Sequence, residues 1–161
     1  MVTRAQELAK EVPVGSAMPL ISGGVAVERI RQLERAMKAS PNQVELPLRH
    51  SFAPGVYARE VFIPKGTLLT GKVHRTDHLV VVSAGDITVL TNAGERRIVA
   101  PATFVEPALL KKVGFANEDT IWICFHPTEE TDLEKLEATF IVPDDEAFGE
   151  LAPAEAVPCL G

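Results

Sequence analysis

Apolar and polar residues alternate in short stretches between residues 56 and 127, which is the pattern of half-buried β-strands. Turn-forming residues interrupt these stretches at intervals of about 8–12 residues. No helical segment lies between them to serve as a crossover, so a parallel sheet is excluded and an antiparallel sandwich or barrel is favoured. The predicted strands are Val56–Ile63, Thr67–Val73, His78–Ser83, Asp86–Thr91, Glu95–Ala100, Thr103–Glu106, Lys111–Phe115 and Thr120–His126.

Helical patterns flank the strand-rich part on both sides. Apolar residues recur at spacings of three and four from Val27 to Met37, which predicts an amphipathic helix over Val27–Ala39. Thr131–Glu134 has the form of a capping box and predicts a short helix through about Ala138. The expected organisation is an arm and helix over residues 1–50, a barrel with its C-terminal helix over 51–142, and an acidic flexible tail over 143–161.

The composition indicates a single soluble domain. The 161 residues carry 16 Lys and Arg against 22 Asp and Glu, a net charge of −6, which disfavours binding to nucleic acid backbones. The longest apolar runs are far shorter than the ~20 residues that span a bilayer, so we expect no membrane partner. The N-terminus has no apolar signal segment, which predicts a cytoplasmic protein.

The segment Gly66–Val73 falls one residue short of the phosphate-loop pattern G-x-x-x-x-G-K-[ST]. Val73 stands where a Ser or Thr hydroxyl would hold Mg²⁺. The segment also continues into more strand, whereas a phosphate loop leads into a helix. We therefore expect no nucleotide cofactor.

Two histidines that follow this segment, His74 and His78, are candidate metal ligands. His74 and His78 would share one face of a regular strand, and two imidazoles can hold a transition metal if a third ligand comes from another strand. The alternative interpretation is that both are surface residues near a turn. His50 lies before the barrel in what we expect to be an irregular lead-in at the surface.

The segment Thr120–His126 is apolar on both faces. Either Trp122, Cys124 and His126 face the interior, which puts His126 near a pocket, or they face outward and the alternate residues face inward. A strand that is apolar on both sides is typically covered twice, so we expect a homodimer or a higher homo-oligomer. On another strand, an inward-facing Arg59 would suit an anion.

The stretch from Pro54 to Glu137 resembles the cupin superfamily, and most closely the small single-domain cupins encoded in phage and prophage genomes. The resemblance implies a mainly β fold: a cupin-type antiparallel β-barrel, or double-sheet jelly roll, with an N-terminal helix and a short C-terminal helix. The matching segments are Tyr57–Glu60, Ile63–Thr67, Thr70–His74, Gly85–Thr88, Ala100–Val105, Gly114–Thr120, Trp122, His126–Thr128 and Thr131–Glu134.

The resemblance also implies a ligand set. Aligned on Gly85, the first cupin motif puts its glutamate at His78, its second histidine at His74 and its first histidine at Lys72. The histidine of the second motif falls on Glu106, so His and Glu are exchanged relative to the usual pattern. The set His74, His78 and Glu106 would hold one divalent Fe, Mn, Zn or Ni ion. Alternatively, Lys72 pairs with Glu106 in a metal-free pocket.

These observations predict a small-molecule-binding cupin with a divalent metal in the barrel and an unassigned reaction. The alternatives are a non-catalytic sensor or sequestering protein for a small anionic metabolite, and a structural or assembly component of a phage particle. A fold alone cannot choose among them. The residues expected to line the ligand pocket are Lys72, Tyr57, Arg59, Trp122 and His126.

Overall fold

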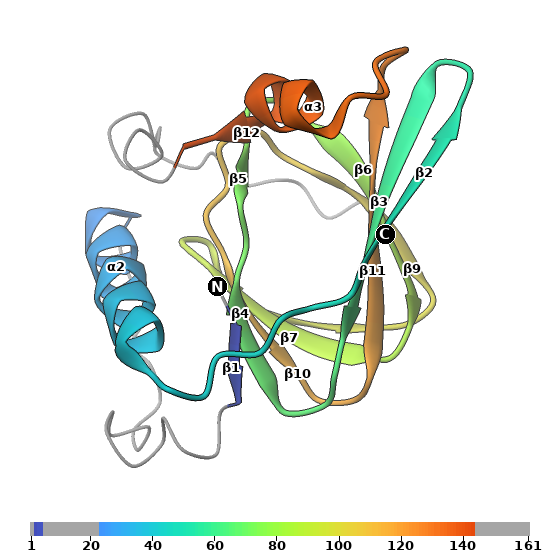
Figure 1. Cartoon of the computed structure of the whole chain (residues 1–161). Coiled ribbons are helices and arrows are strands. Elements are labelled where there is room, and N and C mark those ends of the chain that lie inside the picture. Colours follow the sequence, from blue (N-terminus) through green and yellow to red (C-terminus); the bar gives the residue numbers. More distant parts are fainter. Residues whose placement is uncertain (1, 5–22, 144–161) are drawn as a thin grey trace.

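Two antiparallel five-stranded sheets face each other and enclose the core in the computed structural model, which describes residues 2–4 and 23–143 (Figure 1). In spatial order, the first sheet contains β1 (Val2–Arg4), β4 (Thr67–Thr70), β10 (Val113–Ala116), β7 (Asp86–Thr91) and β8 (Gly94–Val99). The second contains β2 (Leu48–Ala53), β3 (Val56–Ile63), β11 (Thr120–Pro127), β6 (His78–Ala84) and β9 (Ala102–Glu106). A small ribbon pairs β12 (Ile141–Val142) with β5 (Val73–His74).

Neighbouring strands within each sheet are mostly far apart in the sequence. β4 pairs with β10, and β11 lies between β3 and β6, so the chain passes repeatedly from one sheet to the other. All of these pairs are antiparallel. This arrangement confirms the predicted mainly β fold with a double-sheet jelly roll.

The sequence pattern located most of the strands, with two corrections. The expected strand Thr67–Val73 is broken after Thr70 into β4 and β5, because Gly71 and Lys72 leave the first sheet. The lead-in around His50 is not irregular, since Leu48–Ala53 forms β2 and pairs with β3 along its whole length. β2 is an edge strand with mostly exposed side chains, so its apolar pattern is weak.

The main core lies between the two five-stranded sheets. Phe104 and Trp122 meet edge to face there, with ring centroids 5.7 Å apart. The buried residues of this core come from six strands: Val61, Ile63, Val80, Val82, Ile87, Val89, Ile98, Ala116, Trp122 and Cys124. Their alternation along each strand matches the period that predicted the strands.

Helix α2 (Gly23–Ala39) lies beside the barrel (Figure 1). Its apolar stripe buries Ile30 and Met37, as the helical spacing predicts. A buried ion pair also attaches the helix, because Glu34 Oε1 lies 2.6 Å from Lys111 Nζ beside β10.

Helix α3 (Leu133–Phe140) closes one end of the barrel (Figure 1). Leu136 and Phe140 pack against Tyr57 of β3. The N-cap is Asp132 and not the expected Thr131, since the Asp132 carboxylate accepts the backbone N–H groups of Glu134 and Lys135.

The terminal segments are described only in part. Val2–Arg4, at the start of the expected arm, forms β1 on the edge of the first sheet. The rest of that arm before residue 23 and the expected flexible tail from residue 144 lie outside the described residues. Within residues 2–4 and 23–143, neither helix is long and apolar enough to cross a membrane.

Gly85 forms the turn by which the chain leaves β6 of the second sheet and enters β7 of the first. Its φ angle is +93°, in the region that favours glycine, and a Cβ there would lie 2.2 Å from the Asp119 carbonyl oxygen. Asp86, the next residue, accepts hydrogen bonds from Arg97 and from the Asn117 side-chain amide. The turn therefore leaves no room for a side chain where the sheets meet.

Replacing Gly85 by Ala should destabilise the protein more than the same change at Gly66. Gly66 also has a positive φ of +76°, but nothing lies within 4 Å of its added Cβ. Gly66→Ala should therefore cost about 1–2 kcal/mol of unfolding free energy for backbone conformation alone. Gly85→Ala should cost at least ~2 kcal/mol more because backbone must move. Urea unfolding followed by Trp122 fluorescence measures both, and equal losses would contradict the steric account.

Candidate functional site

The inward face of β11 carries Trp122, Cys124 and His126, all of which are buried. Of the two orientations that the sequence allows, the structure therefore has the one that puts His126 inside. The paired strand β3 places Val61 opposite Trp122 and Arg59 opposite Cys124.

His74 and His78 meet inside the barrel although their strand is not continuous. β5 ends at His74, the chain bends through residues 75–77, and β6 begins at His78. The two ring centroids lie 4.1 Å apart. The ring of His126 stacks beside both, at 5.2 Å from His74 and 4.9 Å from His78.

Backbone hydrogen bonds fix the position of His74. Ile141 of β12 lies opposite it in the small ribbon. The Leu109 N–H donates to the His74 carbonyl oxygen at 2.8 Å, and Leu109 has a φ of +60°, unusual for a residue other than glycine. The loop between β9 and β10 thus folds back onto the strand that carries the imidazole.

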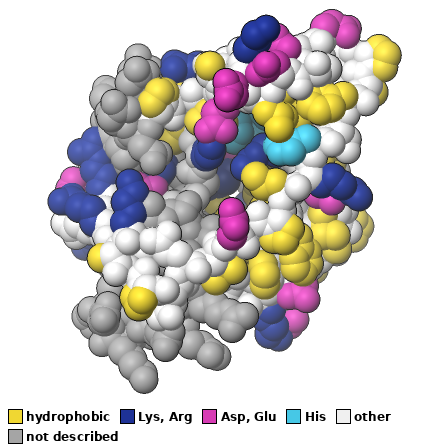
Figure 2. All heavy atoms as spheres, viewed as in Figure 1, with side chains coloured by type: hydrophobic (Ala, Val, Ile, Leu, Met, Phe, Trp, Pro, Cys, Tyr) yellow, Lys and Arg dark blue, Asp and Glu magenta, His cyan; other side chains and the backbone are white. Residues whose placement is uncertain are grey.

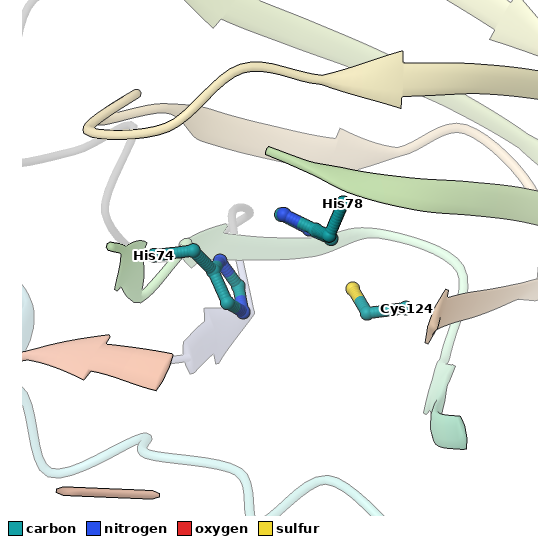
Figure 3. Close-up of side chains that lie close together, drawn as sticks. All are labelled: His74, His78 and Cys124. Carbon is teal, nitrogen blue, oxygen red and sulfur yellow. The ribbon is translucent and has the colours of Figure 1, made fainter. Parts of the chain in front are cut away.

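Donor atoms of His74, His78 and Cys124 all lie within 4.8 Å of one another. Figure 3 shows these side chains, which come from β5, β6 and β11. Nε2 of both His74 and His78 is buried, and His74 Nε2 makes no hydrogen bond among the described residues. His78 Nδ1 lies 3.3 Å from the Thr76 carbonyl oxygen, which leaves Nε2 directed to the interior. Two imidazole nitrogens and one sulfur form a donor set suited to a transition metal.

Glu106 lies beside this group and is compensated by two neighbours. Its Oε2 is 3.3 Å from His78 Nε2, and the Lys112 ammonium donates to the same oxygen. The sequence alternative paired Glu106 with Lys72, and this is wrong: Lys72 forms an ion pair with Glu137 near the surface. Lys112 lies six residues after Glu106, beyond the β9–β10 loop, and it also covers the Trp122 ring at 4.8 Å.

The three histidines of the site differ in pKa because their neighbours differ. Burial, with the charges of His78 and Lys112, lowers the pKa of His74 to about 2. Burial also lowers the pKa of His126 to about 4. For His78, burial would lower the pKa, but the Cys124 thiol and the Glu106 carboxylate outweigh it and raise the pKa to about 9. The neutral imidazole of His74 therefore keeps a free lone pair at neutral pH.

Burial would raise the pKa of Glu106, but the Lys112 charge and His78 hold it low, at about 2. Glu106 is thus an anion at neutral pH, between two cationic partners.

A cavity of about 550 Å³ opens beside the donor group. His74 and Cys124 line its wall, together with Arg59, Lys72 and Lys112. Figure 2 shows a hollow in this face of the molecule with His and Lys or Arg side chains around it. The remaining lining is predominantly apolar and includes Val61, Ile63, Leu69, Ile87, Val89 and Trp122. A volume of this size is typical of small-molecule sites.

The residues expected to bind ligand fall into two groups. Lys72, Arg59 and Trp122 line the cavity. Tyr57 and His126 lie next to it in an aromatic stack, with ring centroids 6.1 Å apart. His50 joins this stack and its Nδ1 lies 2.7 Å from the Tyr57 hydroxyl, so it is half-buried and has a partner.

Sequence reasoning missed two residues of the site. Cys124 is not among the ligands that the sequence analysis names, although its spacing of two from His126 places both on one strand face. Lys112 had no local signal, since its role depends on how the β9–β10 loop folds back.

Comparison with known proteins finds similarity at the level of solved structures. No family model matches the chain, and no curated protein matches it. A cupin-2 domain protein from Shewanella frigidimarina shares 11% identity over 60% of this chain and 92% of its own, with a TM-score of 0.42. A cupin superfamily protein from Desulfitobacterium hafniense shares 9% over 56% and 84%, with a TM-score of 0.45.

The cupin domain of Cnp3 from Schizosaccharomyces pombe shares 19% identity over 63% of this chain and 77% of its own, with a TM-score of 0.43. At such low identities and scores, no property of these proteins is transferred to this chain.

Replacing Lys112 by Met should destabilise the protein far more than replacing Lys72 by Met. The first change leaves the buried Glu106 carboxylate with His78 alone, and stranding a buried charge costs about 3–5 kcal/mol. The second removes an ion pair between exposed side chains, which contributes about 0–1 kcal/mol. Unfolding in urea gives both values, and a Lys72→Met loss as large as that of Lys112→Met would contradict the assignment of the partner.

Proposed function

We propose that the protein is a small-molecule-binding protein of the cupin type that holds one divalent metal ion at His74, His78 and Cys124. The observation that carries this proposal is the buried cluster of three donor atoms within 4.8 Å, on the wall of a cavity large enough for a ligand. The unpartnered Nε2 of His74 supports it, because buried polar atoms rarely lack a partner without a reason.

The ligand set differs in one member from the set that the cupin resemblance implies. Glu106 is held by Lys112 and contacts His78 Nε2, so a metal bound at that nitrogen would displace the proton shared with Glu106, and Cys124 takes the third ligand position. A thiolate favours Zn(II), Fe(II) or Ni(II) over Mn(II), which prefers oxygen ligands. When bound, such a metal supplies a Lewis acid at the cavity wall.

The described residues would place a ligand next to this metal position. Trp122 offers an aromatic surface, Arg59 a cation beside Cys124, and helix α3 closes the nearby end of the barrel over Tyr57. We assign no reaction, because a binding protein without catalysis would use the same cavity. Relation to phage-encoded cupins and a cytoplasmic location are proposed on the sequence features alone.

Protein purified without a His-tag or added metal should contain about one transition metal ion per chain. Cys124→Ser and His74→Ala should each reduce the metal content severalfold or more, since each removes a ligand. His50→Ala is the matched control. It removes a histidine of β2 that is hydrogen-bonded to Tyr57, and it should leave the metal content unchanged. Elemental analysis by mass spectrometry measures all four proteins.

Cobalt substitution gives a second readout for the thiolate. Co(II) bound to sulfur has a charge-transfer absorption in the near ultraviolet, which Cys124→Ser should abolish and His50→Ala should retain. Wild-type protein that holds no metal and gains no melting temperature from added Zn(II), Fe(II), Ni(II) or Co(II) would refute the metal site. Such a result would favour the metal-free sensor or the phage assembly component.

We also propose that the outward face of the second sheet is the contact between two copies of this chain. Exposed or half-buried apolar residues cross this face on adjacent strands, and Figure 2 shows hydrophobic side chains on the right, where Figure 1 places β2, β3 and β9. In register, Phe125 of β11 lies opposite Leu79 of β6, which lies opposite Val105 of β9. The face comprises Phe62, Leu79, Val81, Val105, Ile121, Ile123 and Phe125.

Leu79→Glu should convert a dimer into monomers at micromolar concentration. The side chain is 44% exposed and lies in the middle of the face, so a charge there opposes association without disturbing the core. Leu133→Glu on α3 is the control, with a similar exposure of 46% away from this face. Sedimentation velocity distinguishes the two, and a wild-type monomer would refute the contact.

A further inference from the structure

The charges around the cavity are unevenly compensated. Three cationic side chains line it, and two of them have carboxylate partners: Lys112 contacts Glu106 and Lys72 contacts Glu137. The third, Arg59, makes no hydrogen bond or ion pair with any residue that the structure describes. A half-buried guanidinium on the wall of a cavity is therefore left with its donors unused.

The position of Arg59 brings this cation close to the donor group. In the sheet register it lies opposite Cys124 on one side and opposite His50 on the other, with all three on the inward face. A guanidinium presents a planar fork of N–H groups that matches the two oxygens of a carboxylate. An acid held by Arg59 would thus lie beside the sulfur of Cys124.

The next pair along the same two strands is apolar. Val61 and Trp122 lie opposite each other there, one step from Arg59 and Cys124 toward the core between the sheets. Ile63, Leu69, Ile87 and Val89 continue this apolar wall. A ligand whose acid group contacts Arg59 would extend an apolar body over Trp122.

The net charge of the lining indicates a single acid group. Lys72 and Lys112 each contact a carboxylate, and Glu45, which also lines the cavity, is exposed. Among the described lining residues, Arg59 is therefore the cation without a carboxylate contact, and the negative charge of Glu45 disfavours a polyanion.

We propose that the ligand of this cavity is a small organic monocarboxylate with an apolar body, anchored by its carboxylate on Arg59 and by its body on Trp122. This inference rests on the cavity of the proposed function, whether or not a metal occupies its wall.

The test uses 3-phenylpropionate and octanoate as probes, with 3-phenylpropanamide as the neutral partner and inorganic phosphate as the anion without an apolar body. Titration calorimetry and the fluorescence of Trp122 measure binding to the protein as purified. The two acids should bind, and the amide and the phosphate should bind at least about tenfold more weakly, because a charged hydrogen bond or the apolar contact is lost.

Arg59→Gln should weaken 3-phenylpropionate by about tenfold or more and leave the amide unchanged. Arg59→Lys keeps the positive charge but loses the forked pair of N–H donors. Its affinity for 3-phenylpropionate should therefore fall between those of the wild type and Arg59→Gln. Arg49→Gln is the matched control, since Arg49 is 72% exposed, points outward from β2 and pairs with Glu60.

Equal affinity for acid and amide, an unchanged acid affinity in Arg59→Gln, or no binding of either acid would each overturn the inference. Binding of phosphate as tight as that of the acids would overturn it as well. Metal content measured on the same preparations distinguishes a failure of the carboxylate proposal from a failure of the proposed metal site. Acid binding by protein that holds no metal and takes up none when metal is added refutes the metal site only. Metal-loaded protein that binds amide and acid alike refutes the carboxylate ligand only.

Discussion

Compensation of one buried carboxylate organises the interior of this barrel. Glu106 is 4% exposed, and an isolated carboxylate in such a place would cost several kcal/mol. Lys112 and His78 approach it from different elements, and each is fixed by a second contact: Lys112 by the Trp122 ring and His78 by the Thr76 carbonyl. The need to compensate this charge thus orients the His78 imidazole in the donor group and places the Lys112 ammonium over the Trp122 ring.

The pairing of β3 with β11 sets the order of polar and apolar side chains along the cavity. Because side chains alternate between faces, every second pair points inward. Three successive inward pairs are Tyr57 with His126, Arg59 with Cys124, and Val61 with Trp122. Polarity therefore changes along the strands from an aromatic end, through a cation and a thiol, to an apolar end, and a ligand with one polar and one apolar end has a single favourable orientation.

The strands followed from the sequence where one face is buried and the other is not. Val56–Ile63 and Asp86–Thr91 have the predicted bounds because turn residues and apolar alternation agree there. Leu48–Ala53 escaped prediction because an exposed edge strand is stabilised by pairing with β3 and not by burial of its own side chains. The break after Thr70 escaped for a related reason, since local alternation does not show which sheet a strand joins.

The site was predictable only as far as its residues are close in sequence. His74 and His78 share a strand segment, so their meeting followed from spacing even though the segment bends. To predict Cys124 as a site residue, one must know which face of β11 points inward. A strand that is apolar on both faces gives no such signal. To predict the role of Lys112, one must know the conformation of the β9–β10 loop. In this loop Leu109 adopts a positive φ, and its N–H donates to the His74 carbonyl. That hydrogen bond couples the loop carrying the ammonium to the strand carrying the imidazole. The charge partner of Glu106 and the position of His74 therefore depend on the same long-range contact, which no local pattern encodes.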